Sequence, residues 1–106
     1  MLHACRKCRL PCKIHMAHGS MKEDRMQQSL LRAVELALDG DWDGAHRIAQ
    51  DANEEVAHWI HAVLHKIEGD EWNSRYWYRR TSHAYEEYAD PQEELRAIAA
   101  VLTGGN

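Results

Sequence analysis

Two Gly-Asp pairs constrain the fold of this chain more than any other feature of its sequence. Gly40-Asp41 and Gly69-Asp70 each follow a stretch in which apolar residues recur at steps of three and four, the period of one face of an α-helix. Glycine commonly ends a helix in the left-handed conformation, and an aspartate side chain caps the first turn of the next helix. The sequence therefore predicts successive antiparallel helices joined by short turns.

Helical periodicity continues from about residue 23 to the C-terminus, whereas strand signals are missing. We predict an all-α fold of about five helices, each with one apolar face toward the core. The predicted helices span 23–39, 42–52, 54–68, 71–83 and 91–103. The predicted core positions are Met26, Leu30, Ala33, Val34, Ala37, Ala45, Ile48, Ala49, Ala52, Val56, Ile60, Val63, Leu64, Ile67, Leu95, Ile98, Ala99 and Leu102.

Small residues recur at matching places around the two Gly-Asp pairs, with a period of 29 residues. The matched pairs are Ala33 with Ala62, Ala45 with Ser74, and Ala52 with Thr81. A small side chain at each of these positions allows two antiparallel helices to approach closely across a short turn. The pattern resembles the tetratricopeptide repeat over residues 30–83, and this resemblance implies the helix-hairpin architecture of that family.

A second resemblance covers the segment from Trp59 to Arg80, which has the pattern W-x-H-A-x-L-H-x-x-E-G-D-x-x-N-x-x-Y-W-Y-R-R. This segment is similar to one found in a group of small uncharacterised bacterial proteins. No activity is established for that group. The resemblance therefore supports the helical fold and implies no function.

The charge of the chain, which has 106 residues, divides it into two parts. Residues 1–22 hold five of the thirteen basic side chains and no acidic one, while residues 23–106 hold all seventeen acidic side chains. The net charge of −4 argues against nucleic acid as a partner, and no apolar run reaches the ~20 residues of a membrane span. We therefore expect a basic tail, 1–22, and one helical domain, 23–106, in a cytoplasmic protein without membrane contact.

The tail contains Cys5, Cys8, Cys12 and His15, which together form the donor set of a tetrahedral zinc site. Their close spacing leaves little chain between the ligands, and an odd number of cysteines disfavours a closed disulfide framework. The His-Met and Gly-Ser-Met strings that follow resemble cloning junctions. Three interpretations stay open: a metal-binding knuckle, an irregular leader or vector-derived extension, or redox-active or incidental thiols.

Five side chains able to bind a metal or move a proton form a stripe on the third predicted helix, nearly opposite its apolar face. Because histidines at i, i+3 and i+7 are neighbours, they predict a zinc-like site at His58, His61 and His65, or a base beside an acid. The alternative is the polar outer face of an amphipathic helix, or a surface for helix packing. The stripe consists of Glu54, His58, His61, His65 and Glu68.

The fourth predicted helix is rich in aromatic and guanidinium groups. Its period directs Ser74, Trp77 and Tyr78 toward the preceding helix and leaves other aromatic and arginine side chains on the far side. Such pairs suit anionic or peptide ligands, although aromatic residues in a chain without Phe also supply core bulk. The predicted ligand-binding set is His61, His65, Glu68, Tyr76, Arg79 and Arg80.

These features predict a small helical binding or scaffolding module that binds a protein partner or self-associates, because two repeats and a terminal helix leave apolar faces uncovered. The alternative is a metal- or small-ligand-binding protein, or an enzyme, that uses the histidine stripe. No catalytic residue is assigned, since the sequence has no Walker loop, dinucleotide glycine motif or G-x-S-x-G elbow. The only cofactor that the residues suggest is zinc.

Overall fold

The computed structural model describes residues 20–104, and within this range its regular secondary structure is α-helical apart from one 3₁₀ turn. The predicted all-α fold of five helices is therefore confirmed, and no strand occurs in the described part. None of the helices in residues 20–104 is long and apolar enough to cross a bilayer. The elements are α1 (Ser20–Leu38), α2 (Trp42–Asp51), α3 (Glu55–Glu68), α4 (Glu71–Tyr78), η1 (Tyr85–Glu87) and α5 (Pro91–Leu102).

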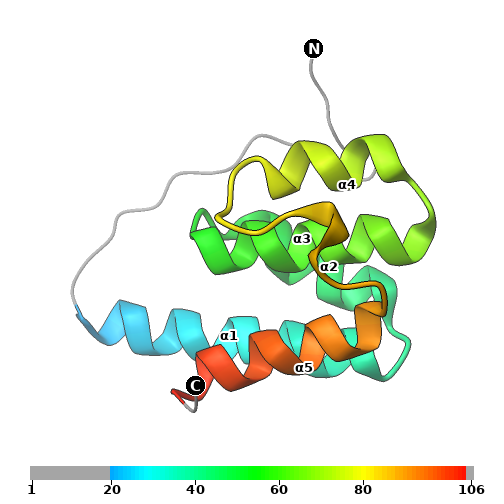
Figure 1. Ribbon diagram of the computed structural model, residues 1–106. Helices are drawn as coiled ribbons and strands as arrows, with labels where there is room; N and C mark the ends of the chain where they lie inside the picture. The colour runs from blue at the N-terminus through cyan, green and yellow to red at the C-terminus, as the bar shows by residue number, and fades with distance from the viewer. Residues whose placement is uncertain (1–19, 105–106) are drawn as a thin grey trace.

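Helix α3 lies at the centre of the domain (Figure 1). It contacts each of the other four α-helices, and α1 also packs against α2 and α5. Because other helices surround α3, its middle turns have almost no solvent-facing side. Its buried residues are Ala57, Trp59, Ile60, His61, Ala62, Val63, Leu64 and His65.

The two Gly-Asp turns form as predicted. Gly40 and Gly69 adopt positive φ angles of 93° and 86°, a backbone conformation that glycine enters without a steric penalty. The Asp41 carboxylate accepts a hydrogen bond from the Gly44 N–H at 3.0 Å, and Asp70 accepts one from the Asn73 N–H at 3.3 Å. Both aspartates therefore cap the helices that follow them.

Small residues lie where the helices approach closely. Ala33, Ala45, Ala62 and Ser74 are fully buried, and the Ser74 hydroxyl donates to the Ala62 carbonyl at 2.7 Å. This hydrogen bond ties α4 to α3 at two of the repeat positions, one from each helix of the second hairpin. Among the predicted core positions, Ile67 differs, because 40% of its surface is exposed in the last turn of α3.

Three predicted helix ends need correction. Helix α4 ends at Tyr78, not at 83, because the Thr81 hydroxyl donates to the Tyr78 carbonyl and accepts from the His83 N–H, which turns the chain. Helix α1 begins at Ser20, and Glu54 rather than Asn53 precedes α3. The predicted zinc ligands Cys5, Cys8, Cys12 and His15 lie outside the described residues.

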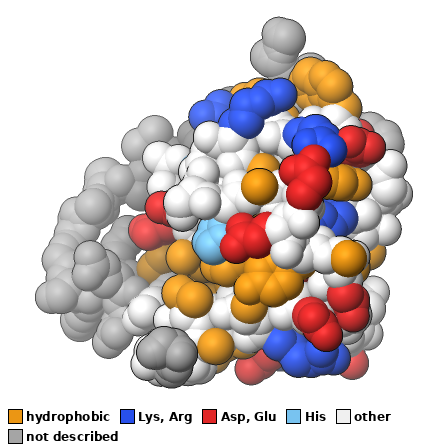
Figure 2. Space-filling model, viewed as in Figure 1, with side chains coloured by type: hydrophobic (Ala, Val, Ile, Leu, Met, Phe, Trp, Pro, Cys, Tyr) orange, Lys and Arg blue, Asp and Glu red, His pale blue; other side chains and the backbone are white. Residues whose placement is uncertain are grey.

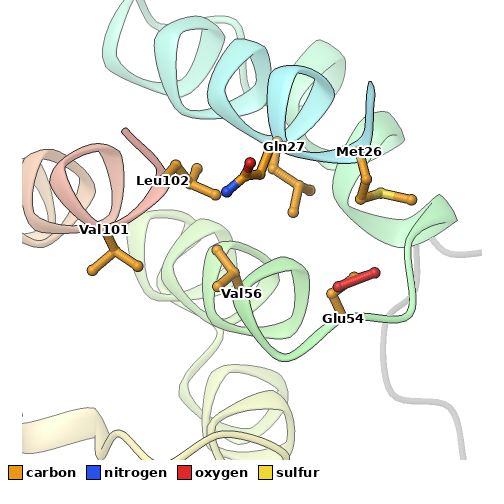
Figure 3. Close-up of a pocket in the computed structure, with 7 residues that line it drawn as sticks. Met26, Gln27, Glu54, Val56, Val101 and Leu102 are labelled. Atoms are coloured by element: carbon orange, nitrogen blue, oxygen red, sulfur yellow. The ribbon is translucent and has the colours of Figure 1, made fainter. Parts of the chain in front are cut away.

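The surface has one basic and one apolar feature that bear on function. Basic side chains gather over α4 at the top of the molecule in Figure 2. Where α1, the start of α3 and the end of α5 meet, Met26 and Gln27 lie across a groove from Val56 and Glu54 (Figure 3). The groove has a volume of about 250 Å³.

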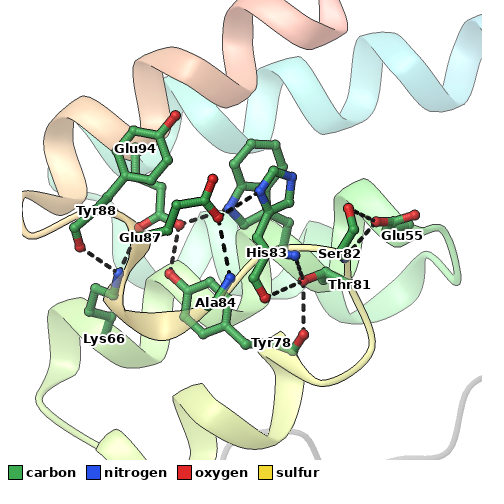
Figure 4. Close-up of polar contacts among 11 residues, drawn as sticks. Glu55, Lys66, Tyr78, Thr81, Ser82, His83, Ala84, Glu87, Tyr88 and Glu94 are labelled. Atoms are coloured by element: carbon green, nitrogen blue, oxygen red, sulfur yellow. Dashed lines mark hydrogen bonds and ion pairs between the residues drawn. The ribbon is translucent and has the colours of Figure 1, made fainter.

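A buried glutamate joins α5 to α3 and α4. Glu94 is fully buried, accepts hydrogen bonds from the Trp59 indole at 2.8 Å and the Tyr78 hydroxyl at 2.7 Å, and pairs with the Lys66 ammonium at 2.8 Å. Lys66 also donates to the carbonyl of Tyr88, as Figure 4 shows. Every partner in this cluster, which we call the Glu94 cluster, comes from the protein itself.

Candidate metal centre

Three buried histidines from two helices meet between α2 and α3. His46 is 3% exposed, while His61 and His65 are each 1% exposed. Each residue offers one ring nitrogen such that the three atoms lie within 4.8 Å of one another. We call these residues the histidine cluster.

The helical period and the packing of α2 on α3 together create this cluster. His61 and His65 are four residues apart on α3, so their rings stack on one side of that helix with centroids 5.1 Å apart. His46 projects from α2 and meets both rings edge-on, at centroid distances of 4.6 and 5.5 Å. The cluster therefore depends on α2 packing on α3 so that the ring of His46 faces those of His61 and His65.

Two tryptophan rings stack on imidazole rings of the histidine cluster. Trp42 stacks on His46 at 4.7 Å between centroids, and Trp77 of α4 stacks on His61 at 4.0 Å. The Trp42 indole is itself fixed, because its N–H donates to the Leu64 carbonyl at 2.6 Å. Packing of this kind limits ring rotation and so preorganises the nitrogens.

A carboxylate orients the third imidazole. Nδ1 of His65 lies 2.8 Å from the Glu68 carboxylate one turn later on α3. A carboxylate accepts hydrogen bonds, so Nδ1 carries the proton and Nε2 is the atom with which His65 would ligate a metal. This carboxylate–histidine arrangement is common behind metal-binding imidazoles.

Two buried polar atoms on α4 lie beside the cluster. Neither Asn73 Oδ1 nor Trp77 Nε1 has a hydrogen-bond partner within the described part of the chain. Trp77 packs on His61, while the Asn73 amide donates to Asp70, whose carboxylate lies within 4.8 Å of the ligand atoms of His65 and Glu68. An unpaired donor and acceptor at this place are suited to a bound polar group.

The donor set fits a transition metal. Imidazole nitrogens bind Zn²⁺ at about 2.0–2.1 Å, which places neighbouring ligands of a tetrahedral site about 3.3 Å apart. Donor atoms that already lie within 4.8 Å of one another reach that spacing by small side-chain rotations. Imidazole also favours zinc, copper, nickel and iron over calcium or magnesium, which prefer oxygen ligands.

The structure brings together only part of the predicted histidine stripe. His61 and His65 are buried against α2 and α4, so the polar outer-face interpretation is wrong for them. Glu54 is exposed, and His58 is half-buried against Trp77 rather than in the cluster. The position that the sequence analysis missed is His46, which stands four residues after Trp42 at the edge of the small-residue face of α2.

The predicted ligand-binding residues at the end of α4 and directly after it lie in two different places. Arg80 donates to the Tyr76 hydroxyl at 2.7 Å and lies over the rings of Tyr76 and Trp77. Arg79 instead borders a different pocket, which Tyr78 and His83 also line. The structure therefore separates the two arginines that the sequence analysis placed in one ligand-binding set.

Comparisons with known proteins add no relative. No protein-family model matches the chain, and no curated protein or solved structure matches it either. The tetratricopeptide resemblance therefore stays a prediction. The functional proposal depends on the site itself.

Proposed function

We propose that this protein binds a divalent transition metal, of which zinc is the leading example, through His46, His61 and His65. The observation that carries the proposal is the convergence of three buried ring nitrogens within 4.8 Å. Three imidazoles are an established set of protein ligands for a single zinc ion.

The surroundings support the same proposal. Glu68 supplies the acceptor that selects the tautomer of His65, and Trp42 and Trp77 restrain the other two rings. Three protein ligands leave one position of a tetrahedral zinc ion for an external ligand, as in catalytic rather than closed structural sites.

A cobalt titration tests the proposal. The full-length chain with Cys5, Cys8 and Cys12 changed to Ser removes competing thiolates, and the visible absorption of Co²⁺ reports its coordination. Zinc should displace cobalt stoichiometrically. His46→Gln should weaken metal binding by more than the ~10–100-fold that outer-shell changes typically cost, because it removes a ligand.

His58→Gln is the matched control, since His58 belongs to the predicted stripe but lies outside the cluster. Its metal affinity should stay within about twofold of the parent chain. Glu68→Ala should fall between the two, about 10–100-fold weaker, because it changes only the orientation of His65. Equal losses in His46→Gln and His58→Gln, or no cobalt spectrum, would contradict the proposal.

The apolar groove between α1, α3 and α5 favours a second candidate function, a binding module that associates with another copy of itself. Val101 is 49% exposed at this groove, beside Met26, Leu30 and Val56. Light scattering after size exclusion should then give a mass that rises with concentration. Val101→Glu should hold the protein at the monomer mass, because it places a charge against apolar side chains.

A further inference from the structure

A pocket beside Trp77 differs in chemistry from the histidine cluster. It has a volume of about 260 Å³, roughly nine times the 30 Å³ that one molecule occupies in liquid water. Trp77 stacks on both His61 and His58, so its ring contacts one residue of the cluster and one residue that lines the pocket. The lining residues are Gln50, Ala52, Asn53, His58, Trp77 and Arg80.

The polar lining of the pocket offers several hydrogen-bond donors and contains no carboxylate. Arg80 supplies a guanidinium, Gln50 and Asn53 supply amides, and His58 supplies an imidazole. Burial and the nearby Arg80 charge lower the pKa of His58, while Glu55 on the same helix opposes this shift. The neutral form of His58 is therefore favoured relative to that of a solvent-exposed imidazole.

Arg80 is held in place before any ligand arrives. Its Nη2 donates to the Tyr76 hydroxyl at 2.7 Å, and its guanidinium lies 4.8 Å from the Tyr76 ring centroid and 5.5 Å from that of Trp77. One hydrogen bond occupies only part of a guanidinium, which has five N–H donors. A planar group fixed in this way is suited to bidentate recognition of an oxyanion.

From this geometry we infer that the pocket formed by Trp77, His58 and Arg80 binds a small oxyanion, either a phosphate group or a carboxylate. The guanidinium supplies the charge, the amides of Gln50 and Asn53 supply neutral donors, and the indole face supplies an apolar wall. The basic side chains over α4 attract anions to this end of the molecule (Figure 2). This inference stands apart from the metal proposal, because it uses none of the three cluster histidines.

Nuclear magnetic resonance can test the pocket directly. The full-length protein is titrated with inorganic phosphate in the presence of EDTA, at fixed pH and ionic strength, so that neither a metal nor general salt accounts for a shift. The expected result is a saturable movement of the His58 imidazole and Trp77 indole resonances. A parallel titration with acetate distinguishes a carboxylate site from a phosphate site, since the tighter of the two identifies the preferred anion.

Paired arginine variants give the decisive comparison. Arg80→Gln should weaken anion binding by about tenfold or more, because it removes a charge-assisted hydrogen bond. Arg79→Gln makes the same change of charge at the next residue, outside the pocket, and should alter the affinity less than about twofold. Equal losses in both variants, or no saturable shift with either anion, would overturn the inference.

Discussion

The two buried polar clusters of this domain both include residues of α3, and they differ in the chemical types of their side chains. In the Glu94 cluster, an acidic group on α5 meets a cation and two neutral donors, all supplied by the protein. In the histidine cluster, three side chains of the same chemical type converge from α2 and α3. The first cluster is an ion pair with neutral donors, whereas the second holds the ligand set of the cation site that we propose.

Because of this difference, we expect the Glu94 cluster to matter mainly for the stability of the fold and the histidine cluster mainly for metal binding. The Glu94 cluster links α5 to α3 and α4, so its loss should be felt throughout the fold. The histidine cluster packs through ring stacking with Trp42 and Trp77, so apolar replacements should preserve much of that packing. Substitutions in the two clusters should therefore have opposite consequences for folding and for metal binding.

The largest expected effect is that of Glu94→Gln on stability. The variant keeps an oxygen for Trp59 and Tyr78 but leaves the Lys66 ammonium, whose side chain is only 8% exposed, without its counter-charge. Breaking a buried ion pair in this way costs about 3–5 kcal/mol. Urea denaturation monitored by circular dichroism measures the loss.

A double variant is the control for the Glu94 prediction. Lys66→Met together with Glu94→Gln removes both charges, so it should recover a large part of the stability that the single change loses. Metal affinity should be unchanged within about twofold in both proteins, since neither residue belongs to the histidine cluster. A double variant as unstable as the single one would show that the charges are not the cause.

His61→Leu should give the opposite result. Without metal, a replacement of similar size costs about 1–2 kcal/mol, because stacking on Trp77 becomes apolar packing. Zinc at a hundredfold excess over its Kd stabilises the parent chain by about 2.7 kcal/mol, equivalent to a Tm rise of about 10–20 °C. The variant should lose this rise. Differential scanning calorimetry on chains with the three cysteines changed to Ser would show it, and an equal zinc effect in both would contradict the assignment.

The smallest expected effect concerns pH and His58. Because its pKa is lowered in the fold from 6.5, the unfolded chain binds more protons than the native one below neutral pH. The stability that neutral His58 contributes is complete above pH 6.5 and is lost as the pH falls through the lowered value. His58→Gln should therefore flatten the fall in Tm between pH 7 and pH 5, measured with EDTA present, while His83→Gln should leave His58's contribution in place.

Local signals in the sequence determined the helices and the turns between them. Gly40 and Gly69 enter the left-handed region, and Asp41 and Asp70 cap the next helices, because these preferences depend on a few neighbouring atoms. The period of α3 likewise placed His61 and His65 on one side of that helix. None of these inferences needed a distant contact.

Only the tertiary structure decided what covers that side of α3. Periodicity gives the direction of a side chain around its own helix axis, but it does not specify which helix packs there. The approach of α2 buried His61 and His65 and added His46, and the approach of α5 joined Glu94 to Trp59, 35 residues away in sequence. Each cluster depends on how one helix packs on another, and such contacts leave no local pattern in the sequence.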